Sequence, residues 1–180
     1  MLRNSITSWG WLSRSLHWLM AALILGQVAL GKYAHELDRS MEKLNLMMWH
    51  KSIGICLLAL LILRLIWTWI NPKPVSVELA SQWQRAAQYL SHAALYLLMF
   101  AIPVSGWLMN SAKNIPFQIF RTIPLPDLLG PSEKLGELFE DWHEGLVKAL
   151  LVLLIVHIAA ALWHHFCRHD KVLMRMLKQH

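Results

Sequence analysis

Charge and cysteine are scarce in this chain, and its longest apolar stretches contain no acidic residue at all. Of the 180 residues, 16% are charged, 56% are hydrophobic and two are cysteine. A soluble domain carries about 25% charged residues, so the composition argues against one. Neither cysteine belongs to a CxxC or CxxCH motif, which argues against a zinc site and against covalently attached haem. Cys56 lies within an apolar run, which disfavours a disulfide.

The hydrophobic residues form four runs, at 16–34, 49–70, 86–109 and 145–166. Since a helix rises about 1.5 Å per residue, about 20 apolar residues cross the hydrocarbon core of a bilayer. Most of the ten tryptophans lie near the ends of the runs, where an indole ring prefers the headgroup level. The sequence therefore predicts an all-α integral membrane protein, a four-helix bundle forming one domain over residues 1–180. The first run, although preceded by basic residues, is too long for a typical signal peptide.

Lysine and arginine are unevenly distributed over the segments between the runs. Eight lie in the N-terminal segment, the 71–85 loop and the tail from Cys167, whereas five lie in the first and third loops. The positive-inside rule then places both termini in the cytoplasm and gives an up-down topology. The long third loop, 110–141, faces the outer side. Because the basic residues form no continuous face, the net charge of +6 does not indicate nucleic-acid binding.

Two local signals concern the shape of the helices. Pro103 lies inside the third run, where a proline is tolerated but usually kinks the helix. Ser132 follows Pro131 and is a favourable N-cap residue. The fourth helix is therefore expected to begin well before its apolar run.

Histidines recur at two depths of the predicted bundle, although ionisable residues in membrane spans are costly and usually functional. In the fourth run, His143 and His157 are 14 residues apart. Their directions then differ by about 40° and their depths by about 21 Å. In an up-down bundle, His17 lies at the depth of His157, and His50 at the depth of His143. Each pair can bind the iron of a flat macrocycle from opposite sides, as in bis-histidine haem.

Other interpretations of these histidines stay open. A single histidine near a helix end is usually interfacial. His92 is a rival of His17 at the inner level, and His35 is a rival at the outer level, although its acidic neighbours suggest a solvated loop. Structural zinc would need four closely spaced ligands. A proton relay would usually include carboxylates, which the four runs lack. Haem remains the preferred interpretation.

Cations near each level are candidates for neutralising haem propionates. Arg64 is 14 residues after His50, hence on nearly the same face at the inner level. Lys51 and Lys148 lie near the outer level. The alternative for all three is that the charged end reaches the membrane interface along its aliphatic stem.

Several segments resemble the bacterial cytochrome b561 family, in order and over nearly the whole chain. Each is short, but the ordered set is fairly specific. The segments are Leu16-His17-Trp18, His50-Lys51-Ser52-Ile53-Gly54, the stretch 92–96 leading to Pro103 and Gly106, Trp142-His143-Glu144 with His157, His164-His165, and the tail 170–176.

The resemblance implies a multi-pass protein of the bacterial inner membrane with two non-covalent haems b. By it, His17, His50, His143 and His157 are the axial ligands. It further implies oxidation of superoxide at the outer haem and reduction of ubiquinone on the cytoplasmic side. His164 matches the family residue near the quinone, and Lys73 is a weaker candidate. The implied partners are membrane lipid, quinone and a periplasmic donor.

The charge of the outer segments departs from what superoxide capture favours. A positive surface would attract that anion, yet the outer segments contain nine acidic and eight basic residues. A local basic patch around the outer haem is still expected from Lys32, Lys51 and Lys148. One alternative is an anchor subunit that passes electrons between quinone and a periplasmic partner such as a hydrogenase, with the acidic third loop as the docking surface. A haem-free membrane transporter or structural protein is the alternative of another class.

Overall fold

The computed structural model describes residues 2–6, 8–72, 74, 81–170 and 172–177, and most of these are helical. The four long helices are α1 (Trp11–Glu36), α2 (Met41–Ile70), α3 (Gln82–Ala112) and α4 (Glu133–Phe166). Each is long and apolar enough to span a membrane. The predicted all-α membrane bundle is confirmed, and each predicted apolar run lies within one helix.

Serine side chains fix where three of these helices begin. Ser40 before α2 and Ser132 before α4 each accept a hydrogen bond from the backbone N–H three residues further on. Ser81 before α3 forms a capping box with Gln84, in which each side chain bonds the other residue's backbone N–H. Such caps satisfy N–H groups that have no partner within the helix. The predicted cap at Ser132 is therefore confirmed.

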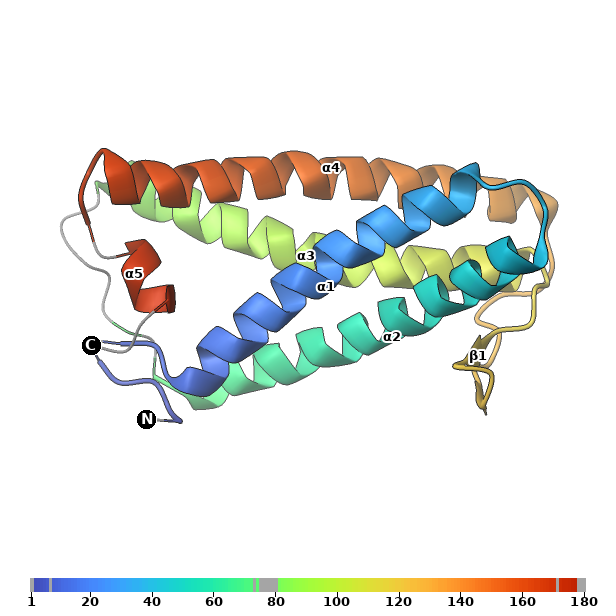
Figure 1. The fold of residues 1–180 in the computed structure, drawn as a ribbon, viewed down its shortest axis with the longest axis horizontal. Coiled ribbons are helices and arrows are strands. Elements are labelled where there is room, and N and C mark those ends of the chain that lie inside the picture. Colours follow the sequence, from blue (N-terminus) through green and yellow to red (C-terminus); the bar gives the residue numbers. More distant parts are fainter. Residues whose placement is uncertain (1, 7, 73, 75–80, 171, 178–180) are drawn as a thin grey trace.

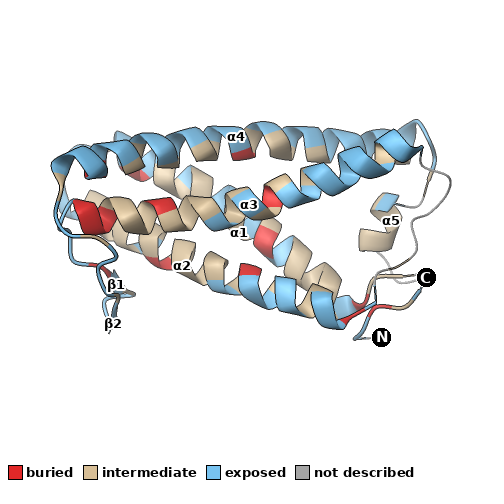
Figure 2. Cartoon of the chain, turned by 180° about the vertical axis from the view of Figure 1, so that it is seen from behind, coloured by how far each residue is buried: buried red, intermediate tan, exposed pale blue. Residues whose placement is uncertain are grey.

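The helices pack as two pairs, α1 with α2 and α3 with α4, and contacts between α2 and α3 join them (Figure 1). The α1 helix runs obliquely across the bundle and makes little direct backbone contact with α4. Few described side chains are fully buried, and most helix surface is exposed or half-buried (Figure 2). Many exposed side chains are leucine, isoleucine and tryptophan. Lipid tails are as apolar as leucine, so this surface suits a bilayer.

The end of the bundle that carries the termini is called the inner end below, and the opposite end the outer end. At the inner end a short helix, α5 (Val172–Leu177), folds back towards the start of α1. Trp18 Nε1 donates a hydrogen bond to Met176 O over 3.0 Å, and Arg14 donates one to Leu177 O over 3.3 Å. The sequence did not predict α5, because six residues are too few to show a clear helical period.

At the outer end the third loop forms a small antiparallel ribbon, β1 (Gln118–Ile119) with β2 (Ile123–Pro124). The Phe120 N–H donates to the Ser52 hydroxyl on α2 over 2.9 Å. The sequence predicted only a long loop here, over 110–141. Phe120 and Arg121 turn the ribbon with φ of 48° and 61°, a conformation that neither residue type favours. The ribbon therefore lacks the Asn-Gly or Asp-Gly signal that predicts a hairpin.

We expect Ser52→Ala to loosen this ribbon. The buried Ser52 hydroxyl accepts the Phe120 N–H and donates to Met48 O over 2.8 Å, and losing such a bond costs about 1 kcal/mol. Tryptic cleavage after Arg121 should accelerate about fivefold, because cleavage follows the population of the open form. Ser91→Ala is the control, since that hydroxyl donates to Gln88 O within α3. Equal cleavage rates in the Ser52 variant and the parent would contradict this role.

Candidate functional site

Four histidines meet in two pairs, one towards each end of the bundle. Towards the outer end, the ring centres of His50 on α2 and His143 on α4 are 6.3 Å apart, with 80° between the ring planes. Towards the inner end, the ring centres of His17 on α1 and His157 on α4 are 6.4 Å apart, at 61°. The structure thus brings together the two pairs that the 14-residue spacing on α4 predicts.

The separation within each pair suits a metal bound between the rings. With a nitrogen–metal bond of about 2 Å on each side, two imidazoles that share an iron have ring centres roughly 6 Å apart. Both measured distances agree with this value. Among the described residues there is no group of three or more His, Cys, Asp or Glu that could hold a metal ion. The donor set therefore suits axial ligation of a macrocycle better than a tetrahedral zinc site.

His143 is held by α3 in an orientation that frees its second nitrogen. Its Nδ1 lies 2.9 Å from Ile102 O and 3.1 Å from Ser105 Oγ. A carbonyl partner assigns the proton to Nδ1, which leaves Nε2 unprotonated and able to ligate; metal-binding histidines are usually oriented in this way. A Cβ on Gly106 would lie 3.2 Å from the His143 ring, so glycine lets α3 approach closely.

His50 lies against α1 at a position where only glycine fits. A Cβ on Gly31 would lie 2.6 Å from His50 Cε1 and 2.9 Å from Nδ1. Gln27, one turn earlier on α1, donates from its side-chain amide to the His50 carbonyl. His50 Nδ1 and Gln27 Oε1 are both buried there and have no hydrogen-bond partner among the residues that the structure describes. The α1 helix therefore forms a close-fitting wall behind the His50 ring.

The inner level contains a third imidazole and a cation. His92 lies 5.6 Å from His157 by ring centres, nearer than His17 does. The His92 side chain is exposed, however, whereas His17 is half-buried. Arg64 lies beside His17, with its guanidinium nitrogen 3.2 Å from Nδ1. The 14-residue spacing thus places Arg64 at the inner level as expected, but its role towards a propionate, like the choice between His17 and His92, stays a prediction.

The cations at the outer level are largely occupied by other groups. Lys51 donates to the buried Asn110 side chain and lies 5.9 Å from the centre of the Phe117 ring. Lys32 and Lys148 form exposed ion pairs with glutamates one turn away, at 4.0 and 3.5 Å. These glutamates offset much of the positive charge expected of Lys32, Lys51 and Lys148. Of these three lysines, Lys51 alone has no carboxylate partner among the described residues.

Of the two residues predicted to lie near the quinone, the structure describes only His164. His164 lies in the last turn of α4, where its Nδ1 is 2.5 Å from a carboxylate oxygen of Asp170. Lys73 lies outside the described residues. Sequence reasoning missed Asp170, because the six-residue separation from His164 becomes a contact only through the turn that follows α4. It also missed Gln27, whose signal was a polar residue one turn before Gly31 in an apolar run.

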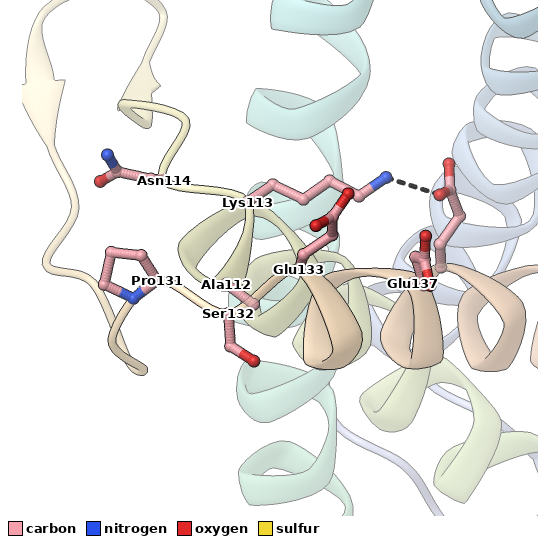
Figure 3. Close-up of a pocket in the computed structure, with 8 residues that line it drawn as sticks. Ala112, Lys113, Asn114, Pro131, Ser132, Glu133 and Glu137 are labelled. Atoms are coloured by element: carbon pink, nitrogen blue, oxygen red, sulfur yellow. Dashed lines mark hydrogen bonds and ion pairs between the residues drawn. The ribbon is translucent and has the colours of Figure 1, made fainter.

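A pocket of about 550 Å³ opens at the outer end, between the end of α3 and the start of α4 (Figure 3). Three glutamates, Glu133, Glu137 and Glu140, line it together with Lys113. Lys113 Nζ forms an ion pair with Glu140 over 2.5 Å. The pocket contains none of the predicted haem ligands, and its surface is predominantly acidic.

Comparison with known proteins identifies the family. Residues 8–179 match the prokaryotic cytochrome b561 family. This chain belongs to that family. It is therefore a membrane electron-transfer protein of a family that binds haem b, which agrees with the fold and with the paired histidines.

Individual relatives are similar over most of their length. Cytochrome b561 homolog 2 of Escherichia coli is 35% identical over 177 residues, covering 97% of this chain and 93% of the relative. Cytochrome b561 homolog 1 of the same organism is 30% identical over 130 residues, covering 71% and 72%. The probable superoxide oxidase CybB of Yersinia pestis is 26% identical over 165 residues, covering 90% and 91%.

We expect Gly31→Ala to reduce binding at the outer level, because the added methyl group would overlap the His50 ring. The haem-to-protein ratio of the purified variant should fall towards half of the parent value. Gly26→Ala is the matched control: it lies on the same helix, is exposed, and its Cβ would meet nothing within 4 Å. An unchanged ratio in Gly31→Ala would show that α1 does not shape this level.

Proposed function

We propose that this protein is a di-haem b oxidoreductase that carries electrons from a periplasmic donor to ubiquinone in the inner membrane. The observation that supports it most directly is that four histidines meet in two pairs. His50 lies opposite His143, and His17 lies opposite His157. Haem iron, when bound, supplies one-electron chemistry at each level. The four histidines hold it, and the helices fix the spacing of the two levels and exclude water.

Side chains around each pair support the binding of a flat, charged cofactor. Ile102 O and Ser105 orient His143, while Gly31 and Gly106 leave room beside the rings. Arg64 at the inner level and Lys51 at the outer level are the cations assigned to the propionates. Both side chains are half-buried, and a charge within a membrane span is costly unless it has a partner.

Superoxide is the proposed donor. The support comes from a relative named as a probable superoxide oxidase, which covers 90% of this chain, and from the resemblance of the ordered motifs. Oxidation of two superoxide anions yields two molecules of oxygen and two electrons. Ubiquinone takes up these electrons with two protons from the cytoplasmic side and becomes ubiquinol. His164, half-buried at the inner end, and Lys73 are the residues assigned to the quinone.

Ligand assignment is tested by the haem content of single variants. We expect His50→Ala and His143→Ala each to lose the outer haem, and His17→Ala and His157→Ala each to lose the inner one, because one imidazole cannot hold the iron from both sides. Reduced-minus-oxidised spectra with a haem-to-protein ratio measure this. His92→Ala should keep both haems; loss of the inner haem in that variant, with none lost in His17→Ala, would reverse the inner assignment.

The electron path is tested with the purified, haem-loaded protein, a steady source of superoxide and ubiquinone-1. We expect ubiquinol to form, and His164→Ala to slow its formation at least tenfold, because the quinone loses a proton-donating neighbour. His165→Ala is the matched control, since its ring lies against Phe166 instead. No ubiquinol from the parent protein would reject superoxide-to-quinone transfer.

A second candidate function is favoured by the acidic outer pocket. Its three glutamates (Figure 3) would suit docking of a basic surface on a periplasmic redox protein, as in an anchor subunit that exchanges electrons with a hydrogenase. Such a subunit would be reduced only slowly by superoxide alone. The superoxide assay on the isolated protein therefore separates the two functions, and a spectrum without an α-band would reject both.

A further inference from the structure

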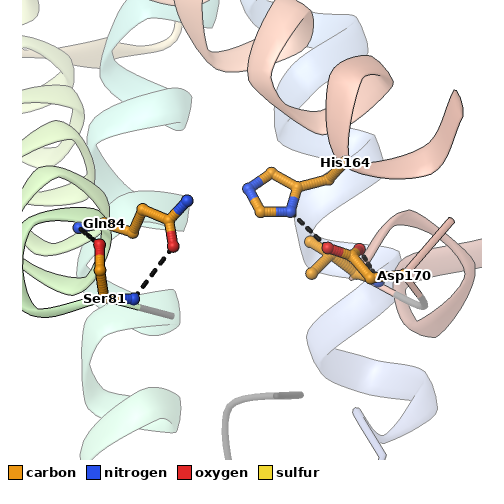
Figure 4. A network of polar contacts seen from close by, with 5 residues as sticks. Ser81, Gln84, His164 and Asp170 are labelled. Carbon is orange, nitrogen blue, oxygen red and sulfur yellow. Dashed lines mark hydrogen bonds and ion pairs between the residues drawn. The ribbon is translucent and has the colours of Figure 1, made fainter. Parts of the chain in front are cut away.

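The carboxylate of Asp170 connects the end of α4 to the start of α5 (Figure 4). One oxygen, Oδ2, lies 2.5 Å from His164 Nδ1, and the other, Oδ1, accepts the Val172 N–H over 3.1 Å. The Asp170 N–H in turn donates to His164 O over 3.2 Å. The Asp170 side chain is only 10% exposed, against 28% for His164. Backbone and side-chain contacts thus fix both residues relative to each other.

Asp170 is ionised in this setting. Burial would raise the pKa of its carboxyl group, but hydrogen bonds from His164 and from the Val172 N–H, with the positive charge of Arg168, outweigh that effect, so the pKa lies below its usual value. A carboxylate can only accept hydrogen bonds. It therefore keeps a proton on His164 Nδ1, so that Nε2 is the ring nitrogen left to exchange a proton with a ligand.

We propose that Asp170 is a positioning residue for quinone reduction, which keeps the proton on His164 Nδ1 and fixes the ring so that Nε2 passes a proton to a quinone oxygen. The proposal rests on the function proposed above. For each ubiquinone reduced, two electrons arrive from the donor side and two protons are taken up. His164 Nε2 delivers one proton to a quinone oxygen and regains it from the cytoplasmic water, while Nδ1 stays protonated against Asp170. The second proton reaches the other quinone oxygen from the same water.

A polar side chain at the start of another helix is a further candidate for a headgroup site at this end of the bundle. Figure 4 shows Gln84, in the first turn of α3, across from the His164 ring. Its carbonyl oxygen is engaged by the Ser81 N–H over 3.0 Å, which leaves its amide NH₂ group on the other side. Quinone oxygens accept hydrogen bonds only, so donors such as His164 Nε2–H and an amide NH₂ match their chemistry.

The rival explanation is that Asp170 only caps α5. That helix also contacts the start of α1 through Arg14 and Trp18, so losing the cap could disturb the inner end in general. Asp170→Asn separates the two roles. Asparagine keeps a carbonyl oxygen for the Val172 N–H but presents NH₂ where the His164 N–H now donates. With NH₂ donating to Nδ1, the ring would carry its proton on Nε2, where it can still hydrogen-bond the quinone but has lost the carboxylate that keeps Nδ1 protonated while Nε2 gives up its proton.

The experiment compares haem-loaded parent, Asp170→Asn, Asp170→Glu and Arg14→Ala proteins in steady-state reduction of ubiquinone-1. We expect Asp170→Asn to lower kcat about tenfold with KM for ubiquinone changed less than twofold. Asp170→Glu should recover most of kcat, since it restores the carboxylate. Arg14→Ala removes a contact to α5 without touching His164, and should leave kcat within twofold of the parent.

Two further readouts make the outcome unambiguous. The haem-to-protein ratio and the dithionite-reduced spectrum should be the same in all four proteins, and ubiquinone binding to the oxidised proteins, followed by quenching of tryptophan fluorescence, should have the same Kd. A kcat for Asp170→Asn equal to that of the parent, in a preparation where His164→Ala is slow, would overturn the proposal for Asp170 alone. Equal losses in Asp170→Asn and Arg14→Ala would assign Asp170 to capping. A parent protein that reduces no ubiquinone would instead reject the proposed function.

Discussion

The arrangement of this bundle depends on one constraint: two histidines of α4 must each face a histidine on another helix. Because His143 and His157 lie four turns apart on one face of α4, their partners must lie at two depths on neighbouring helices, of which α1 runs antiparallel to α4 and α2 runs in the same direction (Figure 1). His50 on α2 and His17 on α1 supply them, at ring-centre distances of 6.3 and 6.4 Å. The α1 and α4 helices make little backbone contact, so side chains such as His17 and His157 connect them.

The two levels are supported differently, and this difference follows from the helices around them. At the outer level, His143 is fixed by the carbonyl of Ile102, and glycines on α1 and α3 allow close approach to both rings. At the inner level, the neighbours are the charged Arg64 and the third imidazole, His92. One level is thus shaped by backbone and small residues, whereas the other is shaped by ionisable side chains, which generally affect the reduction potential of a nearby redox group.

The sequence predicted the features that depend on periodicity and missed those that depend on turns. Apolar runs and a 14-residue histidine spacing predicted four helices and both pairs, because helix geometry converts sequence distance directly into depth and direction. The β1–β2 ribbon and the Asp170 contact were not predictable in the same way. They depend on left-handed residues, namely Phe120 and Arg121 in the ribbon and His169 in the turn after α4. Phenylalanine and arginine do not signal that conformation, and a single histidine signals it only weakly.

The docking of α5 against the start of α1 has a consequence for how the protein is made. The bonds from Arg14 and Trp18 reach backbone carbonyls of Met176 and Leu177, which leave the ribosome only after every membrane span has been synthesised. The first span must therefore be inserted, and stay in the membrane, without the contacts that later cover its beginning. Completion of the inner surface is a late event in biogenesis, and it brings together the earliest and latest translated parts of the described chain.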